Sequence, residues 1–215
     1  MSRTLIIGNK NYSSWSLRAW LALREAGVAF DEHRIALDRP QTKGEILRHS
    51  PSGKVPCLID GEIVVWDSLA ICETANEHYV AGALWPADAE ARAHARAVTA
   101  EMHSGFAALR TYMPMDIRSS RRDAGAAAAK RADVSADIAR IHAIWSDCLA
   151  RSGGPLLYGG FSIADAVFAP VVTRFRTYGV ILPPALAAYA ERVLELAAMR
   201  QWVEAARLES EVIEA

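Results

Sequence analysis

Short apolar runs and longer helical patterns alternate over the first part of the chain. A strand is predicted by TLIIG (4–8), and a helix by SSWSLRAWLALREAG (13–27), whose apolar residues recur every three or four positions up to Gly27. A second strand is predicted by AFDEHRIAL (29–37), and a short helix by KGEILRHS (43–50). This segment therefore has the order strand, helix, strand, helix.

A hairpin and a third helix continue this pattern. Two apolar runs make up VPCLIDGEIVV (55–65), and they are joined by Asp60–Gly61, a pair that favours a two-residue type I′ turn. The helix predicted by DSLAICETANEHY (67–79) follows at once, with Asp67 or Ser68 as its cap. The N-terminal part is thus predicted to be β-α-β-α-β-β-α.

Strand patterns then disappear, and long alanine-rich helical patterns continue to the end of the chain. Two long helices are predicted over 90–113 and 131–150, separated by a polar turn. A further helix over 162–175 begins with Ser162 and Asp165 at the spacing of a capping box, which we assign to folding. This change predicts an α/β domain followed by an all-α domain.

The division is placed at residues 1–80 for the α/β domain, 81–87 for a linker and 88–215 for the helical domain. With 215 residues, of which 52% are hydrophobic, the chain has enough apolar material to build its cores. The formal net charge of −1 argues against a nucleic-acid partner, and no run is long and apolar enough to span a membrane.

Cysteine usage and the N-terminus both favour a cytoplasmic protein. The three cysteines, Cys57, Cys72 and Cys148, are widely spaced, so neither a disulfide framework nor a dithiol motif is predicted. The N-terminal residues lack the features of an export signal. The histidines lack metal-ligand spacing, and we expect no metal.

Three serines crowd the start of the first helix, in NYSSWSLRAW (11–20). One serine suffices as an N-cap, because its oxygen accepts a hydrogen bond from a free amide of the first turn. A helix start also offers amide donors and a partial positive charge, which favour an anion. The additional hydroxyls either cap as well or serve a ligand.

Four motifs, in this order and at these separations, carry a resemblance that runs nearly end to end: SSWSLR (13–18), SGKVPCLIDG (52–61), DSLAI (67–71) and SIADAVFAP (162–170). The chain resembles the glutathione S-transferase superfamily. The resemblance implies a thioredoxin-like N-terminal domain, an all-helical C-terminal domain, and a homodimer that binds glutathione.

The first motif looks most like the zeta class, whose members often isomerise maleylacetoacetate. However, Trp15 stands where that class usually has cysteine, and Lys54 replaces the glutamine commonly found before its Val-Pro. These departures leave glutathione as the expected co-substrate and put the zeta substrate in doubt.

The resemblance implies that a hydroxyl at the start of the first helix donates a hydrogen bond to the glutathione sulfur. Ser13 is the first choice as this catalytic group because it aligns with the serine of zeta-like relatives, and Ser14 is the second. Ser16 is a poorer candidate because it lies inside the first turn. Tyr12 is a further alternative, since some classes use a tyrosine from this neighbourhood.

The remaining glutathione contacts are also implied by the resemblance. A cis Val55-Pro56 bond leaves the Val55 backbone free to pair with the cysteinyl backbone of glutathione. Asp67 and Ser68 bind the γ-glutamyl end, although capping alone also explains them. Lys54 reaches the glycyl carboxylate, with a further polar contact from the segment QTKGEILRHS (41–50), at Lys43 or His49.

The second substrate is expected between the domains. Arg110 either attracts an acidic substrate or is a solvated helix charge, and Arg18 is either structural or solvated. Five residues are candidates for the pocket, although core packing explains them better: Met102, Phe106, Tyr112, Met113 and Met115.

The predicted function is a glutathione transferase that presents an activated thiolate to a small electrophile. Two alternatives stay open, a cis-trans isomerase of the maleylacetoacetate type and a non-catalytic glutathione-binding or interaction module on the same fold. Conjugation, isomerisation, peroxide reduction and dehalogenation all start from the same activated sulfur, so the sequence does not separate them.

Overall fold

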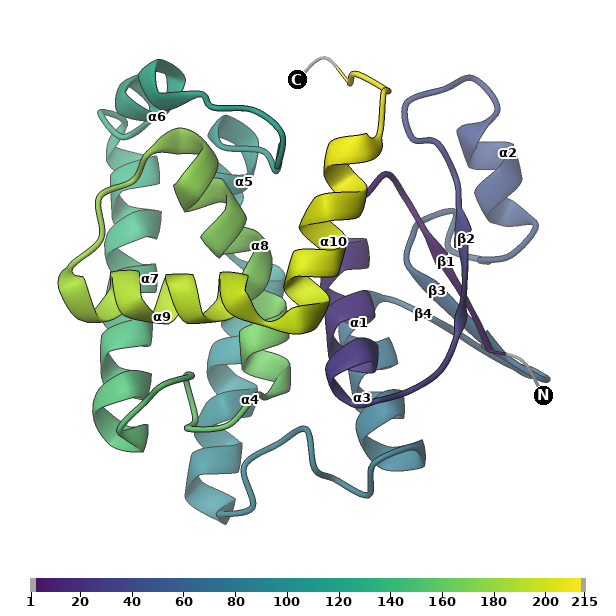
Figure 1. Ribbon diagram of the computed structural model, residues 1–215, viewed down its shortest axis with the longest axis horizontal. Helices are drawn as coiled ribbons and strands as arrows, with labels where there is room; N and C mark the ends of the chain where they lie inside the picture. Colours follow the sequence, from purple (N-terminus) through teal and green to yellow (C-terminus); the bar gives the residue numbers. More distant parts are fainter. Residues whose placement is uncertain (1–2, 214–215) are drawn as a thin grey trace.

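The N-terminal part of the chain forms a four-stranded sheet with three helices (Figure 1). The computed structural model describes residues 3–213. The order in the sheet is β2-β1-β3-β4, with β1 parallel to β2 and antiparallel to β3. The strands and helices are β1 (Arg3–Ile7), α1 (Ser14–Glu25), β2 (Asp31–Arg34), α2 (Thr42–Leu47), β3 (Cys57–Asp60), β4 (Ile63–Trp66) and α3 (Ser68–His78).

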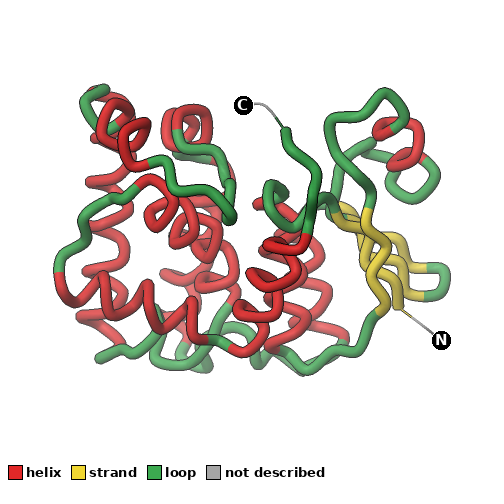
Figure 2. Tube along the Cα trace, turned by 45° about the horizontal axis from the view of Figure 1, so that its top comes forward, coloured by secondary structure: helices red, strands yellow, loops and turns green. Residues whose placement is uncertain are grey.

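The rest of the described chain is helical, and Figure 2 shows the sheet on one side of these helices. The predicted fold class is therefore confirmed. Ser162 and Asp165 form the predicted capping box of α8. The helices are α4 (Ala89–Ser104), α5 (Ala107–Tyr112), α6 (Arg122–Ala128), α7 (Ala132–Ser152), α8 (Ile163–Tyr178), α9 (Pro184–Glu195) and α10 (Ala197–Leu208).

The single helix predicted over 90–113 is wrong, because the structure divides it into α4 and α5. The chain turns at Gly105 and at Phe106, whose φ is 60°. The side chain of Arg110 folds back over the end of α4, where its Nε donates to the Gly105 carbonyl at 3.0 Å and its Nη2 donates to the Met102 carbonyl. These bonds satisfy carbonyl groups that the end of a helix leaves unpaired.

The hairpin between β3 and β4 forms as predicted, but its turn lies one residue later. Asp60 pairs with Ile63, so the central residues are Gly61 and Glu62. Among the described residues of this turn only Gly61 has a positive φ, 61°, which is typical of a type II′ rather than a type I′ turn. Asp60 stays in the strand, where its carboxylate accepts hydrogen bonds from Arg3 and from Tyr79.

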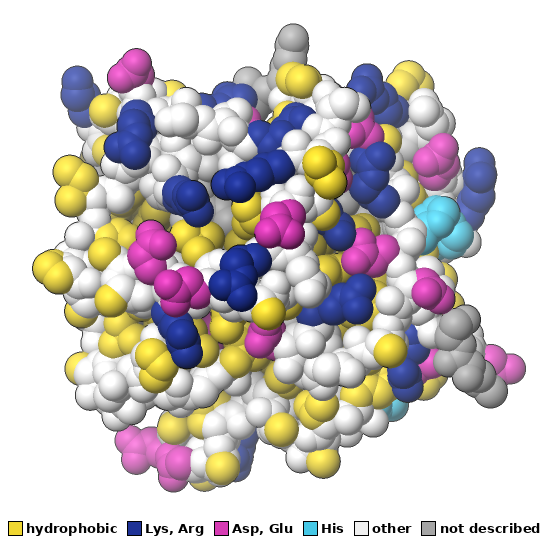
Figure 3. Space-filling model, in the orientation of Figure 1, with side chains coloured by type: hydrophobic (Ala, Val, Ile, Leu, Met, Phe, Trp, Pro, Cys, Tyr) yellow, Lys and Arg dark blue, Asp and Glu magenta, His cyan; other side chains and the backbone are white. Residues whose placement is uncertain are grey.

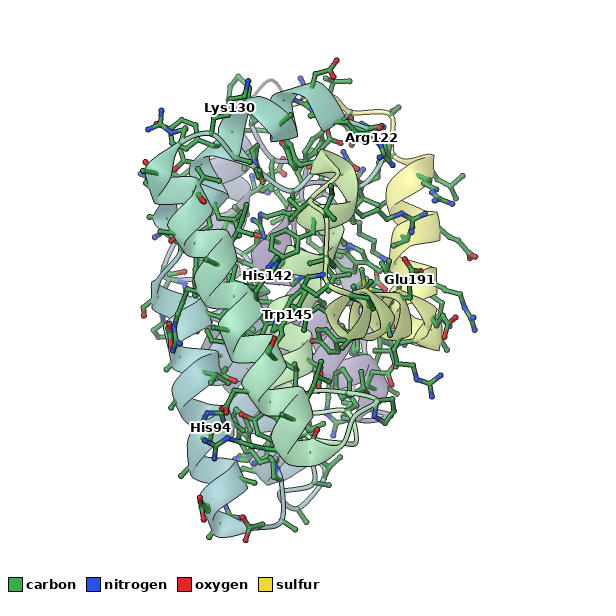
Figure 4. All side chains as sticks on the ribbon, turned by 90° about the vertical axis from the view of Figure 1, so that its left-hand side faces the viewer. His94, Arg122, Lys130, His142, Trp145 and Glu191 are labelled. Atoms are coloured by element: carbon green, nitrogen blue, oxygen red, sulfur yellow. The ribbon has the colours of Figure 1, made fainter. Side chains whose placement is uncertain are left out.

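One hydrophobic core runs through both parts of the chain. It extends from Leu5 in β1 to Trp202 in α10, and α1 packs against both α3 and α8. Trp145 lies inside the helical part, between α7 and α9 in Figure 4, with its ring centroid 4.9 Å from that of Tyr189. The start of α1 is thus held by helices from the second half of the chain.

The surface mixes both signs of charge. Basic and acidic side chains are interspersed over the face shown in Figure 3, in keeping with the formal net charge of −1. Within residues 3–213, no helix combines the length and the apolar character that a membrane span requires.

Replacing Gly125 with alanine is expected to destabilise the fold by about 1–3 kcal/mol, because a Cβ there would lie 2.0 Å from the carbonyl oxygen of Tyr178. The control is Gly44→Ala in α2, where a Cβ meets nothing within 4 Å, so that change should stabilise by about 0.4–1 kcal/mol. Thermal and urea unfolding check both. Equal effects of the two changes would contradict this expectation.

Candidate functional site

Two adjoining clefts open at the start of α1. Trp15, Lys54 and Val55 line both of them. The first cleft has a volume of about 470 Å³, and its other lining residues include Tyr12, Ser13, Ser14, Arg110, Met115 and Arg174. The second cleft has a volume of about 420 Å³, and its other lining residues are Ser52, Pro56, Trp66, Asp67 and Ser68. The structure therefore brings together all the predicted glutathione contacts except those in α2 and just after it.

Ser13 is the N-cap of α1, and its hydroxyl is engaged within the protein. Its Oγ accepts a hydrogen bond from the Ser16 backbone N–H at 3.4 Å and donates one to Ser16 Oγ at 2.8 Å. Ser16 Oγ in turn accepts from the Gly8 N–H at 3.1 Å. One function of the serine cluster is thus to fasten the end of β1 to the start of α1.

Ser14, the first residue of α1, has a different environment. Its Oγ accepts a hydrogen bond from Nη2 of Arg174 at 3.2 Å, and Nε of Arg174 donates to the Met113 carbonyl at 3.0 Å. The hydroxyl proton of Ser14 has no acceptor among residues 3–213. The Ser14 hydroxyl is therefore oriented by an arginine and keeps its proton available for a ligand.

Three arginines lie around the start of α1. Burial, together with the charge of Arg110, lowers the pKa of Arg174 to about 9. Burial also lowers the pKa of Arg18 well below its usual value, and none of the Arg18 guanidinium nitrogens has a partner within residues 3–213. The Arg18 guanidinium lies 4.3 Å, and that of Arg110 4.8 Å, from the Trp15 ring, as in cation–π contacts. Three basic side chains therefore gather at the start of α1.

Asp67 and Ser68 begin α3 at the wall of the second cleft. Asp67 has a φ of 76°, a conformation uncommon outside glycine, and its Oδ1 accepts from the amides of Leu69 and Ala70. Its Oδ2 lies 3.3 Å from Nε2 of His103. Ser68 is 1% exposed, and its hydroxyl has no partner among the described residues. An unpaired buried hydroxyl in a cleft wall is suited to a polar ligand.

The Val55–Pro56 peptide bond is cis, as the resemblance implies. The backbone amide and carbonyl of Val55 have no hydrogen-bond partner within residues 3–213. Lys54 is exposed at the point where the two clefts meet. This strand edge can therefore pair with an extended peptide ligand.

Several other candidates lie away from the clefts. Lys43 is exposed on α2, and the His49 ring lies 4.9 Å from that of His33. Of the five apolar candidates only Met115 lines the first cleft. Tyr112 is exposed, and the other three belong to the core, as core packing predicted: Met102, Phe106 and Met113.

Sequence reasoning missed two residues of the site, Arg174 and His103. Arg174 is separated from Ser14 by 160 positions, and no spacing connects them. His103 lies on α4, and its pKa is lowered, because the effect of burial exceeds the opposite effect of the neighbouring Asp67. Its ring also contacts Trp15 edge-on, with the centroids 5.1 Å apart. Within the described residues, no group of three or more His, Cys, Asp or Glu side chains is arranged to hold a metal ion.

Comparisons with known proteins match almost the whole chain. The family described as glutathione S-transferase, N-terminal domain, matches residues 12–78, and the corresponding C-terminal domain matches residues 90–192. A stringent starvation protein A homolog of Coxiella burnetii is 24% identical over 97% of this chain and 92% of its own length. A probable maleylacetoacetate isomerase of Caenorhabditis elegans is 31% identical over 52% of this chain and 51% of its own length.

Two similar solved structures span nearly the full length. A glutathione transferase homolog from Burkholderia GL BGR1, with bound glutathione, has a TM-score of 0.72 and 25% identity, and the match covers 96% of this chain and 98% of that one. A bacterial maleylpyruvate isomerase, described as a zeta-class glutathione S-transferase, has a TM-score of 0.74 and 26% identity over 97% of this chain and 100% of that one.

Proposed function

The chain belongs to the glutathione S-transferase superfamily, and we propose that it binds glutathione in the second cleft and activates its thiol at the start of α1. The thiolate then attacks a small electrophile in the first cleft. The superfamily's fold is present, with a thioredoxin-like N-terminal domain and a helical C-terminal domain. The single observation that supports activation best is the Ser14 hydroxyl, which Arg174 orients and leaves free to donate.

Glutathione fits the second cleft by chemical type at each of its ends. The Ser68 hydroxyl and the positive end of the α3 dipole suit the γ-glutamyl carboxylate. The Asp67 carboxylate, whose Oδ2 lies beside His103, suits the ammonium group. The free backbone of Val55 suits the cysteinyl residue. Lys54 suits the glycyl carboxylate. The cysteinyl sulfur then comes near the start of α1.

The free energy needed for activation is within reach of these groups. A free thiol has a pKa of about 8.5, and lowering it by about two units requires about 2.7 kcal/mol. A hydrogen bond to a charged acceptor contributes about 1.5–3 kcal/mol, and a helix N-terminus about 0.3–2 kcal/mol. The buried guanidinium groups of Arg18 and Arg174 add positive potential at the same point.

The electrophile is proposed to carry a carboxylate. Arg110 and Arg174 both line the first cleft, and each has a nitrogen without a partner among the described residues. A buried guanidinium with free N–H groups is matched in geometry and charge by a carboxylate. The same feature favours cis-trans isomerisation of an unsaturated acid, in which the thiolate adds to a double bond and is released after rotation.

Measuring glutathione affinity and turnover together distinguishes an enzyme from a non-catalytic glutathione-binding module. The substrate panel pairs an aryl halide that bears a carboxylate, and an unsaturated acid, each with a neutral analogue of similar size. Turnover that is faster for the acids supports the proposal. Glutathione binding without turnover of any electrophile would favour the module, and absence of glutathione binding would reject the site.

Ser68→Ala is expected to weaken glutathione binding about tenfold, because a hydrogen bond to a charged group contributes about 1.5–3 kcal/mol and water replaces part of it. Stability should not fall, since this hydroxyl has no partner within residues 3–213. Calorimetric titration gives the affinity, and thermal unfolding gives the stability. Ser135→Ala, exposed on α7 and outside both clefts, is the control. Unchanged affinity would remove Ser68 from the site.

A further inference from the structure

The loop between β1 and α1, residues 8–12, is held by a carboxylate from the far end of the chain. Oε1 of Glu209 accepts a hydrogen bond from the Lys10 backbone N–H at 2.7 Å, and Oε2 accepts one from the Asn11 backbone N–H at 3.0 Å. The Glu209 side chain is only 8% exposed, although it lies just after the last residue of α10. Hydrogen bonds to an ionised acceptor are about twice as strong as neutral ones.

Two further side chains tie this loop to the same end of the chain. Nε1 of Trp202, on α10, donates to the Lys10 carbonyl at 2.9 Å. The Arg118 guanidinium donates to the Tyr12 hydroxyl at 3.3 Å and to the backbone carbonyls of Glu209 and Glu211. Figure 1 shows α10 beside α1, with the end of β1 close to α10. The loop and the segment after α10 therefore form one hydrogen-bonded unit.

This loop leads directly into the serines. The backbone N–H of Ser13 donates to the Asn9 carbonyl at 2.8 Å, and that of Tyr12 donates to the same carbonyl at 3.1 Å. A displacement of Lys10 or Asn11 is therefore passed on to the start of α1, where Ser13 and Ser14 face the first cleft. Misplacement of a reacting group by about 1 Å can reduce a rate by about a hundredfold.

We propose that Glu209 is a positioning residue, which holds the loop 8–12 so that the serine hydroxyls at the start of α1 meet the glutathione sulfur. This positioning role rests on the proposed function, because it requires that the thiol is activated at the start of α1. Glu209 does not touch the substrate in this proposal and acts only through the backbone of the loop. The C-terminal segment is thereby part of the machinery of the N-terminal domain.

The test compares Glu209→Gln with Glu204→Gln in the full chain. Glutamine loses the charge and presents an amide NH₂ to one of the two backbone donors. Glu204 is exposed on α10 and makes no side-chain hydrogen bond or ion pair within residues 3–213, so it is the control for the loss of one carboxylate. The readouts are the pKa of the bound glutathione thiol, from thiolate absorbance, together with kcat, the KM for glutathione and the melting temperature.

Glu209→Gln is expected to raise the thiol pKa and to lower kcat about tenfold or more, with little change in the KM for glutathione. Glu204→Gln should leave the thiol pKa and kcat unchanged. A lower melting temperature with an unchanged thiol pKa would show that Glu209 is only structural and would overturn the proposal.

A second variant keeps the test decisive if Glu209→Gln does not fold. Arg118→Lys keeps the positive charge but has fewer donors for Tyr12 and the two carbonyls, so a smaller rise of the thiol pKa is expected. No rise in either folded variant would overturn the proposal.

If neither Ser13→Ala nor Ser14→Ala moves the thiol pKa, the proposed function itself fails. If a serine variant moves it and the Glu209 and Arg118 variants do not, only the positioning role fails.

Discussion

Ser14→Ala is expected to raise the pKa of the bound glutathione thiol by about one to two units, equivalent to about 1.4–2.7 kcal/mol. The reason is that Arg174 donates to Ser14 Oγ, which leaves the Ser14 proton for the sulfur. Ultraviolet titration of the thiolate in the binary complex measures this pKa. At neutral pH the rate with a generic electrophile should fall in proportion to the lost thiolate.

Ser13→Ala gives the matched comparison. Ser13 is the N-cap of α1, so its loss should destabilise the fold by about 1 kcal/mol, and its hydroxyl is already engaged with Ser16. We therefore expect a smaller rise of the thiol pKa than in Ser14→Ala. The opposite order would restore Ser13 as the activating group, which is the prediction from sequence. Negligible shifts in both would reject activation by a hydroxyl.

Arg174→Met is expected to lower kcat/KM for a carboxylate-bearing electrophile about a hundredfold, because removing one partner of a buried charge pair costs about 2–5 kcal/mol. The kcat/KM for a neutral electrophile of the same size should fall much less, because only the hydrogen bond from Arg174 to Ser14 is lost. Discrimination between the two substrates, measured as the ratio of their kcat/KM values, is the readout.

The stability of this variant gives an independent check. Arg174 is buried, and burial lowers the pKa of its guanidinium to about 9, so the folded protein bears a desolvation penalty there. Replacing a buried ion pair by apolar side chains of similar volume is often neutral or stabilising. Arg174 pairs with no carboxylate within residues 3–213, so its replacement leaves no uncompensated charge, and the melting temperature should stay within a few degrees. Arg176→Met, exposed on the same helix, is the control for charge. Equal losses for acidic and neutral electrophiles would contradict the carboxylate site.

Much of the fold was predictable because local signals agree with one another. Gly27 ends α1 with a φ of 69°, Asp67 caps α3, and Ser162 and Asp165 form a capping box, each through bonds within a few residues. The break at Phe106 was missed, because a single glycine such as Gly105 inside a helical pattern is often tolerated, whereas here Gly105 ends α4 and Phe106 has a φ of 60°. The hairpin turn moved by one residue because Arg3 and Tyr79 hold Asp60 in the strand.

The sequence by itself determined the order of the elements, which follows from periodicity and capping, and it carries the family motifs. The resemblance that these motifs carry implied five residues of the second cleft: Lys54, Val55, Pro56, Asp67 and Ser68. Only the tertiary structure decided which of two adjacent serines has a free proton. Arg174 reaches Ser14 and Glu209 reaches Lys10 because α8 and α10 pack against α1. Such contacts join segments far apart in the chain, and their geometry depends on how helices pack, which no local spacing specifies.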